Sequence, residues 1–222
     1  VLAPTDDPDN DFYTRKRQSF LGEWLTLGGK TVSVNNFSDE YTNTISDLLE
    51  LDASNARRTR LQAVLGQNVV FTQRRRQDID FIFLIAQPAA ARQIIPSLAY
   101  LFAGDIPVYA SQDLYSGVPR PVEDRDLNGV LFPESPWLLG RIESNLSKAK
   151  NLFPATTAQN LRLQAFGIDA FRLVSRLPVL EASSEYSLSG TSGQLRLGPE
   201  HNVIRELEWA TITDGVIQPI ER

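Results

Sequence analysis

The sequence predicts an α/β protein built on an open, doubly wound parallel sheet, and three observations support this fold class. Strand-like apolar segments alternate with helical segments along the first 135 residues, which is typical of right-handed β-α-β crossovers. Residues 81–86, "FIFLIA", are apolar without alternation, as in a parallel strand covered on both faces. After Pro136 the pattern changes to helices and then to short segments separated by Gly and Ser, which predicts antiparallel strands.

The first part of the chain predicts two strands and three helices. Residues 1–4 predict a short apolar strand, and the acidic, turn-forming stretch 5–11 follows it. The β-branched stretch 31–37 predicts a second strand, and residues 42–65 predict two helices with a cap at Ser54 or Asn55. Between the two strands a helix is predicted, because large side chains recur at spacings of four and three before Gly28-Gly29: Tyr13, Arg17, Phe20, Trp24 and Leu27.

The middle of the chain continues the alternation. Residues 81–86 are expected to be a central strand, and residues 106–110 the next one. Between them, residues 88–103 predict a helix that breaks and restarts, because Pro88 suits a first helical turn and Pro96 removes an internal hydrogen bond. A further short strand is expected at 129–132.

The last part of the chain predicts two helices followed by antiparallel strands. Residues 141–150 and 158–180 have helical spacing, and residues 187–218 have the pattern of short strands joined by turns. In the longer helix, one apolar stripe is predicted to face inward: Leu163, Phe166, Ala170, Leu173 and Leu177.

Composition limits the functions that the chain can have. The formal net charge of −5 opposes binding to nucleic acid, and no apolar run approaches the length of a membrane span. With no Cys, thiolate nucleophiles and thiolate metal sites are excluded. Two arginine clusters stand out against this acidic background, at 57–60 and 74–76. Such runs are more often a solvated helix face than an anion-binding patch, and both interpretations stay open.

A search for catalytic motifs finds none with the required context. The only histidine, His201, lies in "GPEHN", far along the chain from the strand-end loops. "SGTSGQ", residues 189–194, lacks the helix that follows a nucleophile elbow. Asp7, Asp9 and Asp11 begin like a calcium loop, but the required Gly and final Glu are missing. We therefore expect no catalysis, no metal site and no cofactor.

Four blocks of the sequence resemble one known family. They are "DIDFIFLIAQPAAARQIIPSLAYLFAGDIPVYASQDLYSG" from residue 78, "DLNGVLFPESPWLL" at 126–139, "LRLQAFGIDAFRLVSRLP" at 161–178 and "GTSGQLRLGPEHNVIRELEWATITDG" at 190–215. In this order they resemble the C-terminal domain of the LppC/LpoA family, outer-membrane lipoproteins that activate a class A penicillin-binding protein.

The resemblance implies a type I periplasmic-binding-protein-like fold of two lobes around a cleft. Residues 1–135 would form the second α/β lobe, and residues 136–222 would supply crossover helices and terminal strands that return to the other lobe and the hinge. The N-terminal part of such a domain would lie upstream of this chain.

The resemblance also implies a function without catalysis. The protein would bind and stimulate a class A penicillin-binding protein, a peptidoglycan synthase, from the periplasmic side of the outer membrane. Its only membrane attachment would be a lipid anchor outside this chain. The alternative is a periplasmic domain that binds a small molecule, such as an amino acid or a cell-wall fragment, in the cleft.

Ligands of open α/β sheets bind beyond the carboxyl ends of the strands. Trp137 is expected to be a hinge anchor between lobes or a contact for a partner. The polar residues that follow the predicted strands are the candidates for lining the cleft, although the same residue types also cap helices and close turns: Thr5, Asp6, Asp7, Gln87, Ser111, Gln112 and Tyr115.

Overall fold

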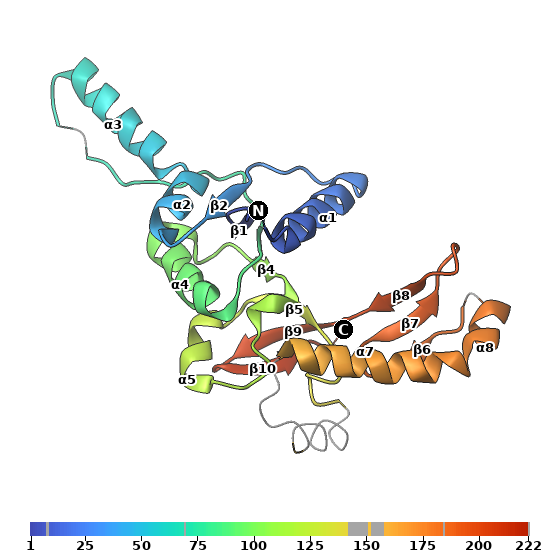
Figure 1. Ribbon diagram of the computed structural model, residues 1–222. Coiled ribbons are helices and arrows are strands. Elements are labelled where there is room, and N and C mark those ends of the chain that lie inside the picture. Colours follow the sequence, from blue (N-terminus) through green and yellow to red (C-terminus); the bar gives the residue numbers. More distant parts are fainter. Residues whose placement is uncertain (8, 69, 142–150, 152–157, 184, 222) are drawn as a thin grey trace. The chain divides into compact units, whose positions relative to one another are not determined.

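The computed structural model describes residues 1–222 apart from 8, 69, 142–150, 152–157, 184 and 222 (Figure 1). The chain divides into two compact units, Val1–Leu114 and Tyr115–Arg222. In the described part of the chain, no helix is long and apolar enough to cross a membrane. The division into lobes at residue 135 stays a prediction, and the helix predicted at 141–150 lies almost wholly outside the described residues.

The first unit alternates strands and helices, as its sequence predicts. Its elements are β1 (Leu2–Pro4), α1 (Phe12–Thr26), β2 (Asn35–Phe37), α2 (Tyr41–Leu48), α3 (Leu51–Leu65), β3 (Ile82–Leu84), α4 (Pro88–Leu98), the π-helical turn η1 (Ala99–Ala103), β4 (Val108–Ala110) and the 3₁₀ turn η2 (Gln112–Leu114).

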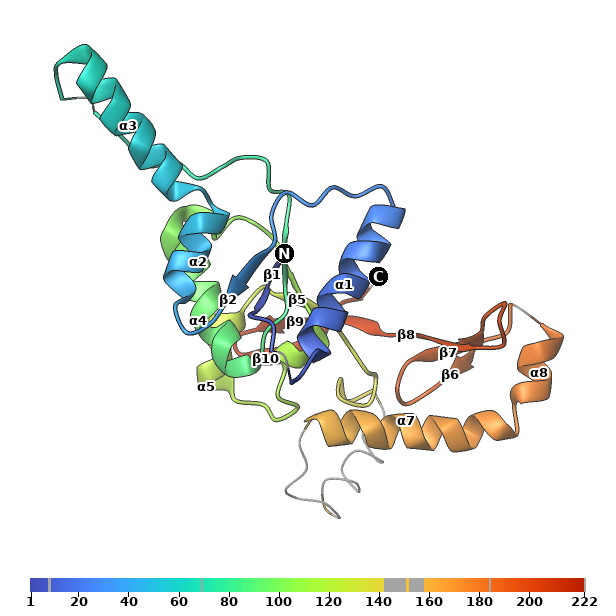
Figure 2. The same ribbon diagram turned by 45° about the horizontal axis from the view of Figure 1, so that its top comes forward.

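The strands of the first unit are parallel and lie in the order β2-β1-β3-β4. Figures 1 and 2 show α1 on one side of these strands and α2 and α4 on the other. Because strand side chains alternate between faces, Phe83 points toward α1, where its ring stacks on Phe20 with the centroids 3.7 Å apart. Ile82 and Leu84 are buried on the opposite face. The predicted central strand covered on both faces is therefore confirmed.

Two local predictions in this unit were wrong. The break between α2 and α3 falls at Glu50, whose backbone adopts the left-handed conformation (φ 54°), so Ser54 lies inside α3. The buried Ser54 hydroxyl accepts a hydrogen bond from the backbone N–H of Arg74 at 3.2 Å, which is a tertiary contact rather than a helix cap. Pro96 does not break α4; the chain leaves helical geometry later, at Leu101 and Phe102.

The second unit combines helices with antiparallel strands. Its elements are α5 (Pro121–Asp124), the 3₁₀ turn η3 (Arg125–Leu127), β5 (Leu131–Glu134), α7 (Ala158–Val174), α8 (Leu177–Ala182), β6 (Leu188–Ser189), β7 (Gln194–Leu197), β8 (Val203–Glu206), β9 (Glu208–Thr213) and β10 (Val216–Pro219). Antiparallel neighbours occur in the order β5-β9-β10 in one set of strands and β6-β7-β8 in another.

A two-residue turn joins β9 to β10. Asp214 and Gly215 both have positive φ, 51° and 74°, as a type I′ hairpin requires. A Cβ atom on Gly215 would lie 1.9 Å from the carbonyl oxygen of Pro121. Only glycine therefore fits the second turn position, for both conformational and steric reasons.

The buried face of α7 differs from the predicted one. Leu161, Ala165 and Asp169 are buried, whereas Leu163 and Phe166 are 61% and 53% exposed. Of the other predicted residues, Ala170 and Leu177 are exposed and Leu173 is half-buried. The spacing of apolar residues in the sequence therefore predicted the wrong side of this helix to be buried.

A buried carboxylate explains the orientation of α7. Asp169 accepts hydrogen bonds from the backbone N–H groups of Thr191 and Ser192 at 2.8 and 2.7 Å, and from both of their hydroxyls. This contact requires the Asp169 side of the helix to face the loop before β7. The small side chain of Ala165 lies on the same side, within a cluster that includes Trp137 and Leu161.

Candidate functional site

The first two turns of α1 bind the loop that follows β1. One nitrogen of the Arg17 guanidinium, Nη2, donates to both carboxylate oxygens of Asp6, at 2.9 and 2.8 Å, and Nη1 donates to Asn36 at 2.8 Å. The Thr14 hydroxyl also donates to Asp6. These hydrogen bonds, first from Arg17 and then from Thr14, lower the pKa of Asp6 below its usual value of 3.8.

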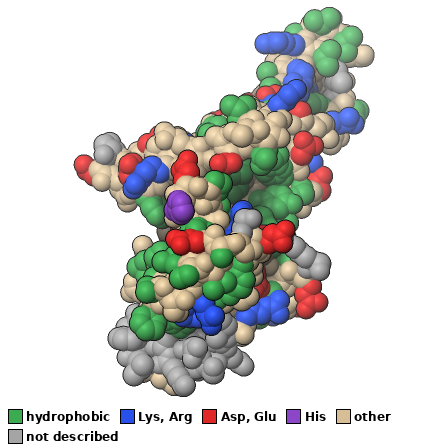
Figure 3. Space-filling model, turned by 90° about the vertical axis from the view of Figure 1, so that its right-hand side faces the viewer, with side chains coloured by type: hydrophobic (Ala, Val, Ile, Leu, Met, Phe, Trp, Pro, Cys, Tyr) green, Lys and Arg blue, Asp and Glu red, His purple; other side chains and the backbone are tan. Residues whose placement is uncertain are grey.

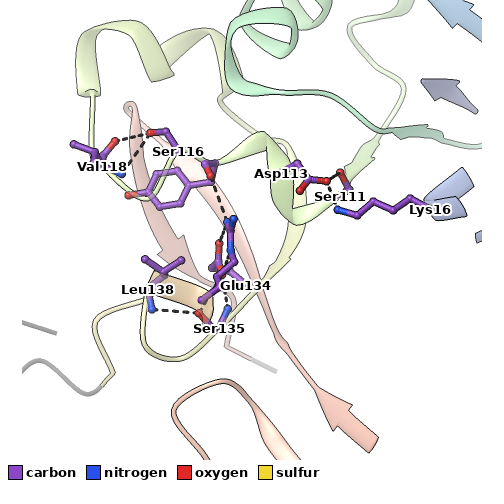
Figure 4. Close-up of polar contacts among 10 residues, drawn as sticks. Lys16, Ser111, Asp113, Ser116, Val118, Glu134, Ser135 and Leu138 are labelled. Atoms are coloured by element: carbon purple, nitrogen blue, oxygen red, sulfur yellow. Dashed lines mark hydrogen bonds and ion pairs between the residues drawn. The ribbon is translucent and has the colours of Figure 1, made fainter. Parts of the chain in front are cut away.

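The same helix turns also bind the residues that follow β3 and β4. The Gln87 amide donates to the hydroxyl of Tyr13 at 2.9 Å. Lys16 forms an ion pair with Asp113, and the Ser111 hydroxyl donates to the same carboxylate oxygen at 3.0 Å (Figure 4). The strand ends of β1, β3 and β4 are therefore all joined to α1 by polar side chains.

Three of the predicted cleft residues, Asp6, Gln87 and Ser111, are thus linked to side chains of the first turns of α1. We call these three separate contacts the α1 network. Sequence reasoning missed Lys16 altogether and used Arg17 only as one of the residues whose spacing predicts the helix. The available signal was position: α1 begins soon after the carboxyl end of β1, so its first turns lie near the carboxyl ends of the neighbouring parallel strands β3 and β4.

The remaining predicted residues of the first unit have other roles. The Thr5 hydroxyl donates to the carbonyl oxygen of Phe37 at 3.0 Å, which extends the β1–β2 pairing. The exposed Asp7 side chain accepts the backbone N–H of Asp9 at 3.0 Å and closes a turn. Gln112 lies half-buried in η2. Asp7 fits the turn-closing interpretation of these residues, whereas Thr5 makes a contact between strands.

A buried ion pair organises the second unit. Arg162 on α7 donates through Nε to Glu134 at the end of β5, at 3.1 Å, and through Nη2 to the second carboxylate oxygen. Nη2 also donates to the backbone carbonyl of Tyr115 at 3.3 Å. The side chain of Glu134 is 0% exposed and that of Arg162 is 13% exposed. A fully buried carboxylate requires such a partner, because its desolvation is costly.

Glu134 has a second set of donors in its own neighbourhood. The Ser135 backbone N–H and hydroxyl donate to it at 2.7 and 3.1 Å, and the Ser135 hydroxyl accepts the backbone N–H of Leu138 (Figure 4). Tyr115 is 4% exposed, and burial raises the pKa of its hydroxyl well above the usual value of 10.0. These residues form the packed interior of the unit.

Trp137 is also an interior residue of the second unit. Its side chain is 2% exposed and belongs to the apolar cluster with Leu161 and Ala165. Its backbone N–H donates to the carbonyl of Thr191 at 3.0 Å, while its indole N–H has no hydrogen-bond partner among the described residues. The hinge role of Trp137 stays a prediction.

The serine motif considered above has a structural explanation. Ser192 is 0% exposed, and its hydroxyl donates to Asp169 at 2.7 Å. His201 lies beyond β7 in an exposed turn with φ 56°, and it is the purple side chain on the surface in Figure 3. Ser192 therefore holds a loop on α7 rather than presenting a hydroxyl to solvent.

The α1 network offers both acidic and basic groups, but they are already paired. Asp6 is neutralised by Arg17, and Asp113 is neutralised by Lys16. A ligand with a carboxylate or an ammonium group would have to replace these intramolecular pairs. The arrangement can therefore hold α1 on the strand ends, and it could recognise a small charged ligand only by rearranging.

Solved structures with the same fold define the class of protein. The LpoA C-domain from Haemophilus influenzae, described as a regulator of PBP1A, aligns with a TM-score of 0.68 at 21% identity, over 100% of this chain and 60% of that one. A Chromobacterium violaceum protein, described as a "putative branched-chain amino acid ABC transporter", aligns at 0.62 and 25% identity, over 95% of this chain and 57% of that one. The fold is periplasmic-binding-protein-like.

A family model identifies the chain more closely. The model described as "LppC putative lipoprotein" matches residues 4–215, and the chain belongs to this family. Its relatives include the "Penicillin-binding protein activator LpoA" of Photobacterium profundum, 28% identical over 99% of this chain, and that of Vibrio cholerae, 28% identical over 91%. The chain spans only about a third of each relative's length, 36% and 34%.

The buried ion pair predicts unequal effects of two arginine substitutions. We expect Arg162→Ala to lower the free energy of unfolding by about 3–5 kcal/mol, because it leaves Glu134 buried without its cation. Arg141 serves as the matched control, since its 3.3 Å pair with Glu208 is 44% and 39% exposed. Arg141→Ala should cost at most about 1 kcal/mol. Denaturant unfolding followed by circular dichroism measures both, and equal losses would contradict the prediction.

The lowered pKa of Asp6 predicts how stability changes with pH. The charged form is favoured in the folded state, so its stabilisation is complete above the usual pKa of 3.8 and is lost as the pH falls through the lower folded-state pKa. Asp6→Asn should therefore lower Tm at about pH 6, and this difference should shrink progressively below about pH 4. Thermal unfolding across this range tests it.

The control is Asp9→Asn in the same loop, because the described residues include no ion partner for the Asp9 side chain. This variant should leave the pH profile of Tm close to that of the wild type. A difference between wild type and Asp6→Asn that stayed constant down to the lowest pH would show that the Asp6–Arg17 contact does not depend on the charge of Asp6.

Proposed function

We propose that this chain is part of a lipoprotein that binds a class A penicillin-binding protein and activates peptidoglycan synthesis. The observation that carries the proposal is the family match over residues 4–215. Support comes from the relatives named as penicillin-binding protein activators and from the structural relative described as a regulator of PBP1A. An activator of this kind acts on the synthase and performs no reaction of its own.

The proposed location is the periplasmic side of the outer membrane, with a lipid anchor outside this chain. The lipoprotein description of the family supports an anchored protein. A regulator of peptidoglycan synthesis needs access to the synthase on the periplasmic side. The net charge of −5 and the absence of a membrane-crossing helix in the described residues are compatible with attachment through lipid alone.

A second candidate function is binding of a small ligand at the strand ends of the first unit. The observation that favours it is the 25% identity to a structure described as a "putative branched-chain amino acid ABC transporter", together with the polar residues Asp6, Gln87 and Ser111 near the strand ends. The internal pairing of Lys16 and Arg17 counts against it, because a ligand must displace existing ion pairs.

The main proposal predicts binding and activation in one sample. The purified full-length lipoprotein, without its lipid, should bind the class A synthase of the same organism and raise its rate of peptidoglycan synthesis severalfold. Binding is measured by biolayer interferometry, and synthesis by incorporation of labelled lipid-linked precursor. A class B penicillin-binding protein from the same organism is the control, and it should not bind. Lack of binding by a folded sample would overturn the proposal.

The second candidate predicts stabilisation by a ligand. In a thermal-shift screen of amino acids and muropeptides, a ligand at a hundredfold excess over Kd would add about 2.7 kcal/mol to the unfolding free energy. Lys16→Ala should abolish the shift for a ligand at the α1 network, while Arg196→Ala, an exposed residue of β7, should not. A screen without shifts would remove this candidate.

A further inference from the structure

Helix α3 projects from the first unit with little tertiary support. Figures 1 and 2 both show it extending away from the strands. Its buried residues are Leu51 and Ser54, both at its beginning. From residue 56 onward, every residue of the helix is exposed except Gln62, which is half-buried. The outer part of α3 therefore makes no core contact in the described part of the chain.

One side of this projecting helix combines arginine with aliphatic side chains. At about 100° per residue, six residues fall within an arc of about 160°. We call this surface the α3 face: Arg57, Arg58, Arg60, Leu61, Val64 and Leu65.

The composition of the α3 face is unusual for a solvated helix. Leu61, Val64 and Leu65 are 53%, 82% and 54% exposed. The opposite side carries the acidic Asp52 in the first turn and neutral polar residues further along, including Thr59 and Gln62. The projection at the top of Figure 3 lies at the same height as α3 in Figure 1. It carries both Lys or Arg side chains (blue) and hydrophobic side chains (green). The charged and apolar side chains lie on the same side of the helix. The periodicity of apolar residues alone therefore does not reveal this face.

The charge of this region is strongly positive within an acidic chain. No Asp or Glu lies between Asp52 and Asp78, whereas this stretch contains both arginine clusters, 57–60 and 74–76. The whole chain has a net charge of −5. Basic character is therefore concentrated here rather than spread over the sequence.

The two arginine clusters differ in how their charges are used. Arg75 pairs with Asp105 at 2.7 Å, and Arg76 pairs with Glu50 and Asp78, which holds the returning chain to the base of the projection. The side chains of Arg57 and Arg60 have no ion pair or hydrogen bond to any described residue.

Arg58 has an aromatic neighbour but no carboxylate. Its guanidinium lies 5.2 Å from the ring centroid of Phe71, on the chain segment that returns from α3. A cation–π contact leaves the guanidinium N–H groups free for an anionic partner. The α3 face thus presents three arginine cations without internal counter-charges among the described residues.

An isolated helix of this length is only marginally stable in water. Nucleation is costly, and helices shorter than about 12–15 residues depend on tertiary packing. The exposed outer part of α3 lacks this packing, and its aliphatic side chains remain in solvent. Covering the α3 face would therefore stabilise the helix as well as neutralise its charge.

We propose that the α3 face is a docking surface for an acidic segment of a protein partner that also presents apolar side chains. Arginine forks match carboxylate geometry, and arginine is enriched at the centres of protein interfaces. An anionic membrane fits less well, because membrane-surface helices separate an apolar face from a basic one and usually insert aromatic residues. The three aliphatic side chains here offer little area for insertion.

This inference rests on the proposed function, since it assigns the α3 face as the contact for the penicillin-binding protein. The acidic segment then belongs to the synthase. Charge complementarity of this kind speeds association and specifies the partner. The salt dependence of the interaction should therefore originate at α3.

Charge reversal on the α3 face tests the assignment. In the full-length protein, the triple variant R57E/R58E/R60E should bind the synthase about tenfold or more weakly, with a slower association rate. Its affinity should also depend less on salt than that of the wild type. A second variant, L61S/L65S, should weaken binding without changing the salt dependence.

The matched control is R196E/R205E, which reverses two exposed arginines on β7 and β8. This variant should bind the synthase within about twofold of the wild type. Circular dichroism and thermal unfolding confirm that each variant is folded before its binding is compared.

The outcomes separate the two proposals. If the wild type does not bind the synthase, the proposed function fails. If the wild type binds and the triple variant binds equally well, the function stands and the α3 assignment is overturned. If the triple variant loses only binding to vesicles of phosphatidylglycerol and phosphatidylethanolamine, while synthase binding is unchanged, α3 contacts membrane and the assignment is also overturned.

Hydrogen exchange supplies an independent readout. Amides of residues 56–65 should exchange rapidly in the free protein and become protected when the synthase is added. The same amides should gain no protection in the presence of the class B control protein. Protection that appeared only elsewhere in the chain would place the docking surface outside α3.

Discussion

The first unit depends on one constraint, the burial of β3 on both of its faces. A strand with apolar side chains on both faces must be covered twice, because each exposed face would leave apolar area in water. Phe83 meets Phe20 of α1 on one side, and Ile82 and Leu84 are buried on the other. This requirement places helices on both sides of the parallel strands.

The position of α1 has a consequence for chemistry. Once α1 packs on the strands through Phe20, its first turns pass the carboxyl ends of β1, β3 and β4. Tyr13, Lys16 and Arg17 then reach Gln87, Asp113 and Asp6 from one helix. The same edge that binds ligands in related folds is occupied here by internal ion pairs. This pairing favours a structural role for the edge, so a binding surface is better sought elsewhere on the molecule.

The arginines of this acidic chain divide according to their partners. Within the first unit, Arg17 pairs with Asp6 after β1, and Arg75 and Arg76 fix the base of the α3 projection. Within the second unit, Arg162 pairs with Glu134. Arg57 and Arg60 have no such partner among the described residues. An arginine that pairs with a carboxylate within the chain is explained by its role in folding. An arginine with no such pair in the described chain is not, so it is the better indication of a partner.

The sequence by itself determined the alternation of strands and helices, the central place of β3 and the family, because apolar periodicity and ordered motif blocks are local properties. The tertiary structure decided which side of α7 is buried, where α2 ends and how the strand-end residues are used. Asp169 turned α7 toward the loop at Thr191, and Ser54 became a tertiary contact instead of a cap. These outcomes depend on hydrogen-bond partners 20 or more residues away, which local spacing does not encode.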